Sequence, residues 1–332
     1  MKEQIQKRLD SLTKPQGSLG KLEDIALKMG LIQGRIPKLP RKKAVYVFAG
    51  DHGVVEEDVS ASPKEVTPQM VLNFLNGGAA INVFSRHTNS DVLVVDAGVN
   101  FYFKDNPGLI KKKVGYGTKN FTKERAMSII EAKKSIEYGR EIARHSIVNG
   151  VELAAIGDMG IGNTTTATAI ACAFGIPLKD IIDIGTVITN EQLNNKKRAV
   201  EKAIELHKPF KDSIDVLSKV GSYCFGEMAG FLLECAENKI PVVLDGFPTT
   251  AAAMIAYKIN PKIKNFIFAG HKSLVKGHSV ILKSMELDPI LDLNMRLGEG
   301  TGAVLSFSLI EAAIKMINEM ETFESANVSK KE

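Results

Sequence analysis

A glycine-rich segment in the middle of the chain has residue types suited to binding a phosphate. Gly157–Gly162 follows the apolar run Leu153–Ile156 and leads into a segment of small residues without further Gly or Pro up to Phe174. A strand, a turn and a helix start in this order present backbone N–H groups and a helix dipole to an anion. The glycine spacing resembles a P-loop, but Asn163 stands where a P-loop has Lys. We therefore expect a phosphorylated ligand other than a nucleoside triphosphate.

Glu299 is the side chain best suited to acid–base chemistry. It lies in Leu297–Gly302, with a glycine on each side, directly before a long apolar helical pattern. Glycines let the backbone approach a ligand closely and keep other side chains away from the carboxylate. A carboxylate held in this way could serve as a general base. The alternative is an ordinary solvent-exposed glutamate in a loop.

Two pairs of residues carry types that occur in catalytic or metal sites. Asp51 and His52 resemble an acid–base pair, although an Asp beside a Gly also makes Asx turns. His271 and His278 would need a third zinc ligand, and their spacing does not follow the i, i+4 pattern of helical ligands. We therefore expect no metal site.

Polar side chains elsewhere could bind an anion or a flat ring. Lys272 and Ser273 directly follow an apolar run and could contact a phosphate. Lys196 could point to the same anion or could be a solvated lysine on a helix. Ser62 and Gln69 belong to a loop that could face a planar substrate, but this loop could equally be an ordinary connection.

The composition is that of a globular protein with an ample core. The 332 residues are 44% hydrophobic and 24% charged. The formal net charge of +5 suits anionic small substrates, and the basic residues are too scattered to indicate a nucleic-acid surface. The three cysteines have no metal-binding spacing, and we find no signal peptide and no apolar run long enough to span a bilayer. We expect a cytoplasmic protein.

Six short apolar segments are typical of buried parallel strands. Helical patterns lie between them, as in Pro68–Arg86, Lys123–Val148, Glu191–His207 and Met228–Ala236. This alternation indicates a doubly wound α/β fold with a mainly parallel, Rossmann-like sheet. The predicted strands are Ala44–Ala49, Val92–Val95, Leu153–Ile156, Ile181–Ile184, Pro241–Leu244 and Phe266–Ala269.

The carboxyl end of every predicted strand carries a glycine together with Asp, His or Thr. Ligands of open α/β sheets bind at this edge. Turn chemistry alone hardly explains all these ends, so the sequence predicts one shared active site there. The ends are Gly50–Gly53, Asp96–Gly98, Gly157–Asp158, Gly185–Thr186, Asp245–Gly246 and Gly270–His271.

The two ends of the chain differ from this pattern. Residues 1–35 contain two short helical patterns, and residues 302–320 form one long apolar pattern followed by a polar tail. We therefore expect a small helical subdomain made of residues 1–35 and 302–332. The large α/β catalytic domain would then comprise residues 36–301.

Several segments together match the pattern of one known family. They are Leu12–Leu22, Ala49–Val54, Val66–Val71, Gly77–Asn82, Met159–Thr165 and Leu297–Gly302. With them the chain resembles the nicotinate-nucleotide:dimethylbenzimidazole phosphoribosyltransferases, which activate the lower ligand of cobamides such as vitamin B12. The resemblance runs to about Leu305, nearly the whole chain, and the combination of segments is highly specific.

The resemblance implies that nicotinate mononucleotide gives its phosphoribosyl group to a lower-ligand base such as dimethylbenzimidazole. The products are an α-linked ribazole phosphate and free nicotinate. Glu299 would take the N–H proton of the base while its other nitrogen attacks C1′ of the ribose. A second carboxylate, Asp158, would stabilise the oxocarbenium-like transition state. The resemblance also implies a homodimer and no metal or organic cofactor.

The same resemblance assigns the other binding residues. The phosphate and nucleotide would be held by residues at strand ends and helix starts, and the base by residues of two loops. The first set is Gly160, Gly162, Asn163, Thr164, Lys196, Asp245, Lys272 and Ser273, and the second is Ser62, Gln69 and Leu297.

Three departures from the family pattern bear on the acceptor. Asp158 replaces the usual Glu and is one methylene shorter. Ala61 and Ser62 stand where the family often has an aromatic residue, which predicts a roomier, more polar base pocket. Gly221–Gly226 brings a thiol in place of a Gly-Gly-aromatic-Glu-Ile-Ala pattern. The acceptor could therefore be a benzimidazole, a purine or a phenol.

Some relatives activate phenols as a heterodimer of two similar subunits. A subunit of such a heterodimer, either catalytic or only nucleotide-binding, is therefore the alternative interpretation.

Overall fold

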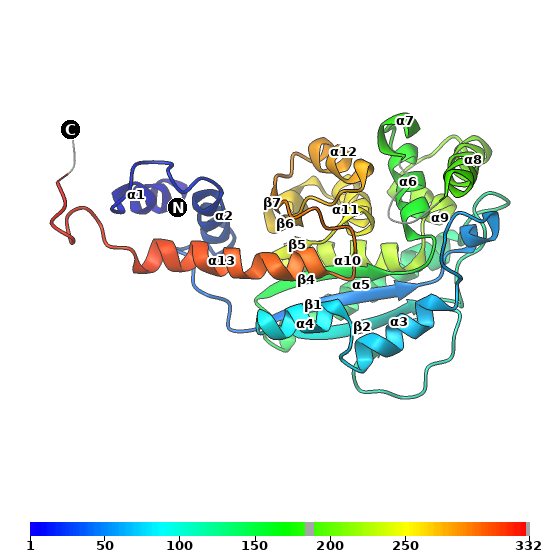
Figure 1. Cartoon of the computed structure of the whole chain (residues 1–332), viewed down its shortest axis with the longest axis horizontal. Coiled ribbons are helices and arrows are strands. Elements are labelled where there is room, and N and C mark those ends of the chain that lie inside the picture. The colour runs from blue at the N-terminus through cyan, green and yellow to red at the C-terminus, as the bar shows by residue number, and fades with distance from the viewer. Residues whose placement is uncertain (183–188, 330–332) are drawn as a thin grey trace.

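Seven strands form one parallel sheet in the order β3-β2-β1-β4-β5-β6-β7 (Figure 1). The computed structural model describes residues 1–182 and 189–329. Strand order reverses between β1 and β4, which confirms the doubly wound α/β prediction and places a switch point there. The strands are β1 (Lys43–Gly50), β2 (Asp91–Gly98), β3 (Leu109–Lys111), β4 (Leu153–Met159), β5 (Val242–Leu244), β6 (Ile267–His271) and β7 (Pro289–Leu291).

One predicted strand, Ile181–Ile184, is wrong where it can be checked. Ile181 ends a short helix, α7 (Leu178–Ile181), which begins directly after Pro177 and buries Ile181. The rest of that prediction, including the strand end Gly185–Thr186, lies outside the described residues. The edge strands β3 and β7 were not predicted, because three residues without full burial give no clear apolar run.

The predicted helices are present, with one division. Pro68–Arg86 forms two helices, α3 (Val66–Leu75) and α4 (Ala80–His87), because Gly77 adopts a left-handed φ of 76° between them. The other helices are α1 (Lys2–Ser11), α2 (Lys21–Gln33), α5 (Ile129–Val148), α6 (Asn163–Ala173), α8 (Asn190–His207), α9 (Ser213–Val220), α10 (Tyr223–Glu237), α11 (Phe247–Ile259), α12 (Lys276–Ser284) and α13 (Thr301–Glu319), with 3-10 turns η1 (Gly53–Glu57) and η2 (Pro261–Phe266).

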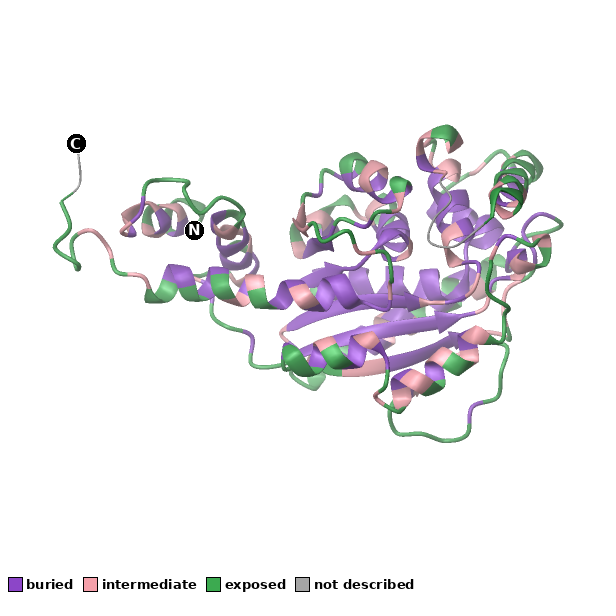
Figure 2. Ribbon diagram, in the orientation of Figure 1, coloured by how far each residue is buried: buried purple, intermediate pink, exposed green. Residues whose placement is uncertain are grey.

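Helices cover both faces of the sheet, so the central strands are buried throughout (Figure 2). On β1, Tyr46 and Phe48 point into the core formed with α5, α6 and α8–α12. Val45 and Val47 point to the opposite core, formed with α1–α4 and α13. Burial on both faces explains why the strands read as continuous apolar runs.

Helices α1 and α2 pack against the carboxyl-terminal half of α13, beyond the amino-terminal ends of the central strands (Figure 1). Arg8 binds the end of α13 by donating from Nε to the carbonyl of Ile317 and from Nη2 to that of Met320, each at 3.0 Å. The length and composition of α13 would suit a membrane span, but most of this helix is buried in the protein. The predicted division into two domains stays a prediction, since the same core continues from the sheet to α1.

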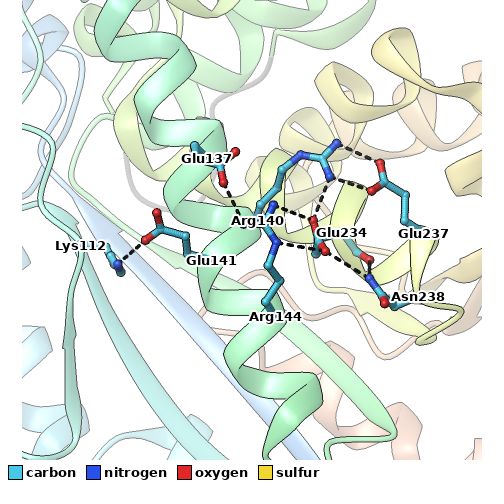
Figure 3. A network of polar contacts seen from close by, with 8 residues as sticks. All are labelled: Lys112, Glu137, Arg140, Glu141, Arg144, Glu234, Glu237 and Asn238. Atoms are coloured by element: carbon cyan, nitrogen blue, oxygen red, sulfur yellow. Dashed lines mark hydrogen bonds and ion pairs between the residues drawn. The ribbon is translucent and has the colours of Figure 1, made fainter.

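Helix α10 is held against α5 by a network of ion pairs (Figure 3). Arg140 Nη1 lies 2.9 Å from both Glu234 Oε2 and Glu237 Oε2, and Arg144 Nε lies 3.2 Å from Glu234 Oε1. The network fixes the outer end of α10. The other end, at Cys224, lies behind the site described next.

Candidate active site

A cavity of about 350 Å³ opens at the carboxyl ends of β4, β5 and β6. This volume is in the range of small-molecule sites, and the position is where doubly wound sheets bind ligands. Most of the predicted residues line it, whereas Gln69 and Lys272 do not. The lining members of the predicted set are Ser62, Asp158, Gly160, Gly162, Asn163, Thr164, Lys196, Asp245, Ser273, Leu297 and Glu299.

Glu299 is presented by a turn of three consecutive left-handed residues. Gly298, Glu299 and Gly300 have φ values of 95°, 64° and 92°. The turn lies directly on β4, because a Cβ at Gly157 would come within 2.4 Å of the Glu299 backbone. Only glycine at 157 therefore permits this crossing. A non-glycine residue with positive φ is strained, and such strain is often kept at functional sites.

The Glu299 carboxyl group is buried, with 6% of the residue exposed. Its Oε2 accepts a long hydrogen bond of 3.4 Å from the backbone N–H of Ile81, in the first turn of α4. Burial raises the pKa of Glu299, and the negative charge of Asp245 adds to the shift. A raised pKa brings a carboxylate closer to the working range of a general base.

Asp245 joins the end of β5 to the start of α13. Its carboxylate accepts from the backbone N–H groups of Gly300 at 3.1 Å, Gly302 at 2.8 Å and Ala303 at 3.2 Å. Burial opposes its ionisation, but the nearby His271 ring and the N–H groups of Gly300 and Ala303 keep the pKa of Asp245 below its usual value. A negative charge at a helix start is stabilised by the dipole. Asp245 therefore fixes the helix that follows the Glu299 turn.

Asp158 is a second carboxyl group in the cavity wall, at the end of β4. Its Oδ2 accepts from Asn163 Nδ2 at 2.7 Å, whereas its Oδ1 is buried without a partner. Burial raises the pKa of Asp158 to about 7, with a contribution from the charge of Asp245. Hydrogen bonds from Asn163 and Cys224 oppose this shift. Near neutral pH the Asp158 carboxyl group is therefore protonated in part of the molecules.

The glycine turn before α6 already uses several of its backbone N–H groups. Ile161 N donates to Thr67 Oγ1 at 3.1 Å, Asn163 N to the Gly160 carbonyl at 3.1 Å, and Thr164 N to Asn163 Oδ1 at 2.7 Å. Lys196 brings a cationic side chain to this turn, with its Nζ 3.1 Å from Thr164 Oγ1. The donors left for an anion here are therefore mainly side chains, and not the free backbone N–H groups of a helix start that the sequence predicted.

Asp51 and His52 are used structurally, behind the cavity. Asp51 Oδ2 accepts from the backbone N–H of Asn100 at 2.7 Å, which is the turn-capping alternative. His52 Nδ1 lies 2.8 Å from Thr166 Oγ1, and Cys224 Sγ lies 3.9 Å from His52 Nε2. Burial lowers the pKa of His52 to about 3, so this ring stays neutral. Neither residue lines the cavity.

At the end of β6 and in the turn that follows, successive side chains point alternately into the cavity and away from it. His271 and Ser273 line the cavity, whereas Lys272 between them points out and pairs with Asp292 at 3.0 Å. His271 was expected at the active-site edge of the sheet and was also considered as a metal ligand. Its Nε2 lies 3.5 Å from Asp245 Oδ1. Within the described ranges no three His, Cys, Asp or Glu side chains form a metal cluster.

Sequence reasoning also missed Arg296 and Met70, both of which line the cavity. Arg296 precedes the Glu299 turn and Met70 belongs to α3, next to the predicted but excluded Gln69. Helical periodicity could have decided between Gln69 and Met70, since neighbouring helix positions face different directions.

Comparison with known proteins gives one consistent result. A family model described as phosphoribosyltransferase matches residues 1–328. The nicotinate-nucleotide–dimethylbenzimidazole phosphoribosyltransferase of Geobacter sulfurreducens is 49% identical over 98% of this chain and 93% of its own length. The enzyme of the same name from Desulforamulus reducens is 50% identical over 99% of this chain and 94% of its own length. The crystal structure of CobT from Thermus thermophilus superposes with a TM-score of 0.96 at 46% identity, covering 99% of both chains.

Proposed function

Since the chain belongs to this phosphoribosyltransferase family, we propose that it transfers the phosphoribosyl group of nicotinate mononucleotide to a cobamide lower-ligand base. The products are an α-ribazole phosphate and nicotinate. The observation that carries the proposal is Glu299, a buried carboxylate held in a strained turn over β4 and facing a cavity lined by a lysine and glycine turns.

In the proposed reaction one nitrogen of the base attacks C1′ of the ribose. The bond from C1′ to the pyridine nitrogen breaks, and its electron pair stays on that nitrogen as nicotinate leaves. Glu299 accepts the N–H proton from the second nitrogen of the attacking base, so that the ribazole product is neutral at the ring. We place Asp158 beside the ribose, where its ionised carboxylate stabilises the positive charge that develops at C1′.

Two groups of side chains in the cavity wall match the two ends of this pair of substrates. Lys196, Thr164, Asn163 and Ser273 supply cationic and hydrogen-bonding side chains for the phosphate, next to the glycine turn Gly160–Gly162. Asp245, being anionic, acts by positioning Glu299 and not by direct contact with the phosphate.

The second group of lining residues combines Ser62 with the apolar side chains of Met70 and Leu297. Leu297 is 58% exposed, so it can close over a flat ring when one binds. The loop at Ala61–Ser62 carries no large side chain, which leaves room for benzimidazoles, purines or phenols as acceptors.

The test replaces Glu299 with Gln, which keeps the size and removes the base. A general base contributes roughly 10²–10⁴-fold, so kcat should fall at least about 100-fold while the Kd for nicotinate mononucleotide stays within about threefold. The matched control is Glu286→Gln, an exposed glutamate that also has a positive φ, of 52°. Turnover of Glu299→Gln close to that of the wild type, with normal nucleotide binding, would show that the base is another group.

The preferred acceptor is found by incubating the protein and nicotinate mononucleotide with benzimidazoles, purines and phenols, and identifying the riboside formed. We propose that the protein works in the cytoplasm as a homodimer, as the family resemblance implies. A heterodimer with a similar subunit is the second candidate, and the presence of Glu299 argues against a subunit that only binds nucleotide. Light scattering of the purified chain, with activity measured alone and with a paralogue, separates the two.

A further inference from the structure

Two turns besides the glycine turn contribute to the wall of the cavity. One follows β5 and contains Gly246, and the other follows β6 and contains Ser273. They lie close to each other, because a Cβ added at Gly246 would come within 3.9 Å of the Cβ of Ser273. Any ligand group bound at this wall depends on how the two turns are held relative to each other.

A chain of buried hydrogen bonds connects these turns through His278 of α12. Ser273 N donates to His278 Nδ1 at 3.0 Å. His278 Nε2 lies 3.0 Å from Thr250 Oγ1, and Thr250 Oγ1 donates to the Gly246 carbonyl at 2.8 Å. Thr250 and His278 are completely buried, and Ser273 is 5% exposed. The chain therefore runs from one turn to the other without contact with water.

The direction of every proton in this chain follows from its first member. A backbone N–H can only donate, so His278 Nδ1 must carry a lone pair toward Ser273. The ring proton of the neutral imidazole then sits on Nε2 and is donated to Thr250, whose own proton goes to the Gly246 carbonyl. Burial also lowers the pKa of His278 to about 3, so the ring keeps this neutral form at every pH at which an enzyme of this kind would work. His278 is therefore fixed in one tautomer and does not exchange protons with a substrate.

The hydroxyl group of Ser273 is oriented by the same turn. Val275 N donates to Ser273 Oγ at 3.3 Å, which occupies a lone pair and leaves the hydroxyl proton for another acceptor. Ser273 lines the cavity, so an anionic oxygen bound there can accept that proton. The position of this donor depends on the Ser273 backbone, which His278 holds.

We propose that His278 is a positioning residue that sets Ser273 for phosphate binding by tying the turn after β6 to the turn after β5. The inference rests on the proposed function in that it takes the mononucleotide phosphate as the group that Ser273 meets. Without the imidazole, Ser273 N becomes a buried donor without a partner, and the turn must move to satisfy it.

The test compares His278→Ala with His278→Asn and His278→Gln. The Asn amide oxygen stands about where Nδ1 was and can accept from Ser273 N, whereas the Gln amide lies nearer to Thr250. His278→Ala should raise both the Kd and the KM for nicotinate mononucleotide about tenfold, with kcat within about threefold. Asn should recover most of this loss and Gln should not.

The matched control is His207→Ala, which removes another buried histidine, bound to the Phe121 carbonyl at 2.8 Å and absent from the cavity wall. It should lower stability without changing the Kd. If His278→Ala does not fold, Thr250→Val decides, because it removes the acceptor for Nε2 and should raise the Kd in the same direction by a smaller factor. A Kd that stays unchanged in the folded variants, or equal recovery by Asn and Gln, would overturn the proposal.

The Kd is measured by calorimetry with nicotinate mononucleotide alone and with inorganic phosphate alone, so no turnover is needed. If the wild type binds the mononucleotide but transfers it to no base, the proposed function fails and the Kd series still decides the role of His278. If the wild type binds neither probe, both proposals are wrong.

Discussion

Replacing Glu299 by Gly should make the protein more stable and inactive at once. Glu299 has a φ of 64°, in the left-handed region that costs an L-residue about 1–2 kcal/mol. Glycine removes that strain, but it gives the unfolded chain extra freedom, which offsets about 0.4–1 kcal/mol. The backbone change alone should therefore raise the free energy of unfolding by roughly 1 kcal/mol.

Removing the buried carboxyl group should add a pH-dependent gain. The pKa of Glu299 is raised in the folded state, so the folded protein resists an ionisation that the unfolded chain undergoes freely. The penalty is absent below the ordinary pKa of glutamate, grows as the pH rises from there to the folded value, and stays constant above it. The stability difference between Glu299→Gly and the wild type should therefore be larger at pH 8 than at pH 4.

Glu286→Gly is the matched control, because Glu286 has a φ of 52° and is exposed. It should show the backbone gain, no comparable burial effect and normal turnover. Unfolding in urea at pH 4, 6 and 8 gives the free energies, and transfer assays with saturating nicotinate mononucleotide give kcat, which should fall more than about 100-fold for Glu299→Gly. If Glu299→Gly is less stable than Glu286→Gly at pH 8, the carboxylate stabilises the fold and the reasoning is refuted.

Two further substitutions test buried carboxyl groups by pH. Asp158→Asn keeps the contact with Asn163 and removes a group whose pKa is raised to about 7, so the variant should gain stability over the wild type between about pH 4 and 7 and equal it below. The activity profile of the wild type should show an inflection near pH 7 that the variant lacks, and identical profiles would exclude Asp158 as its source. Glu227→Gln replaces a fully buried carboxyl group in α10 that has no hydrogen-bond partner and a pKa raised well above its usual value by burial. Its unfolding free energy should exceed that of the wild type increasingly toward high pH with kcat unchanged, and a loss of stability at pH 8 would mean that the carboxylate is paired.

The sequence predicts the fold where burial is complete on both faces, and fails where it is partial. β1 and β4 stand out as uninterrupted apolar runs, whereas β3 and β7 are too short and too exposed to do so. Ile181–Ile184 has the same apolar pattern as a strand, but Ile181 belongs to a helical turn that is itself buried. Apolar runs of this length do not distinguish the two.

The candidate site divides in a similar way. The glycines around Glu299 pointed to a special backbone, and the structure has three left-handed residues there. The position after a predicted strand and the family resemblance pointed to both Lys272 and Ser273. The alternation of side chains along an extended segment turns Lys272 away from the cavity and brings His271 and Ser273 in. The structural uses of Asp245 and His278 depend on partners far away in the sequence, Gly302 and Thr250 among them, which no local pattern reveals.

Helix α13 connects the Glu299 turn to the amino-terminal helices α1 and α2. Its 19 residues span about 28 Å, with Asp245 bound at the start and Arg8 at the end. Because the helix is stiff, a shift of its carboxyl-terminal end also moves its amino-terminal end. Packing around α1 and α2 therefore helps to set the orientation of the Glu299 carboxylate. These two helices thus help to position the reaction centre from the far end of α13. Substitutions in α1 or α2 that shift the position of α13 should change kcat, although no residue of these two helices lines the cavity.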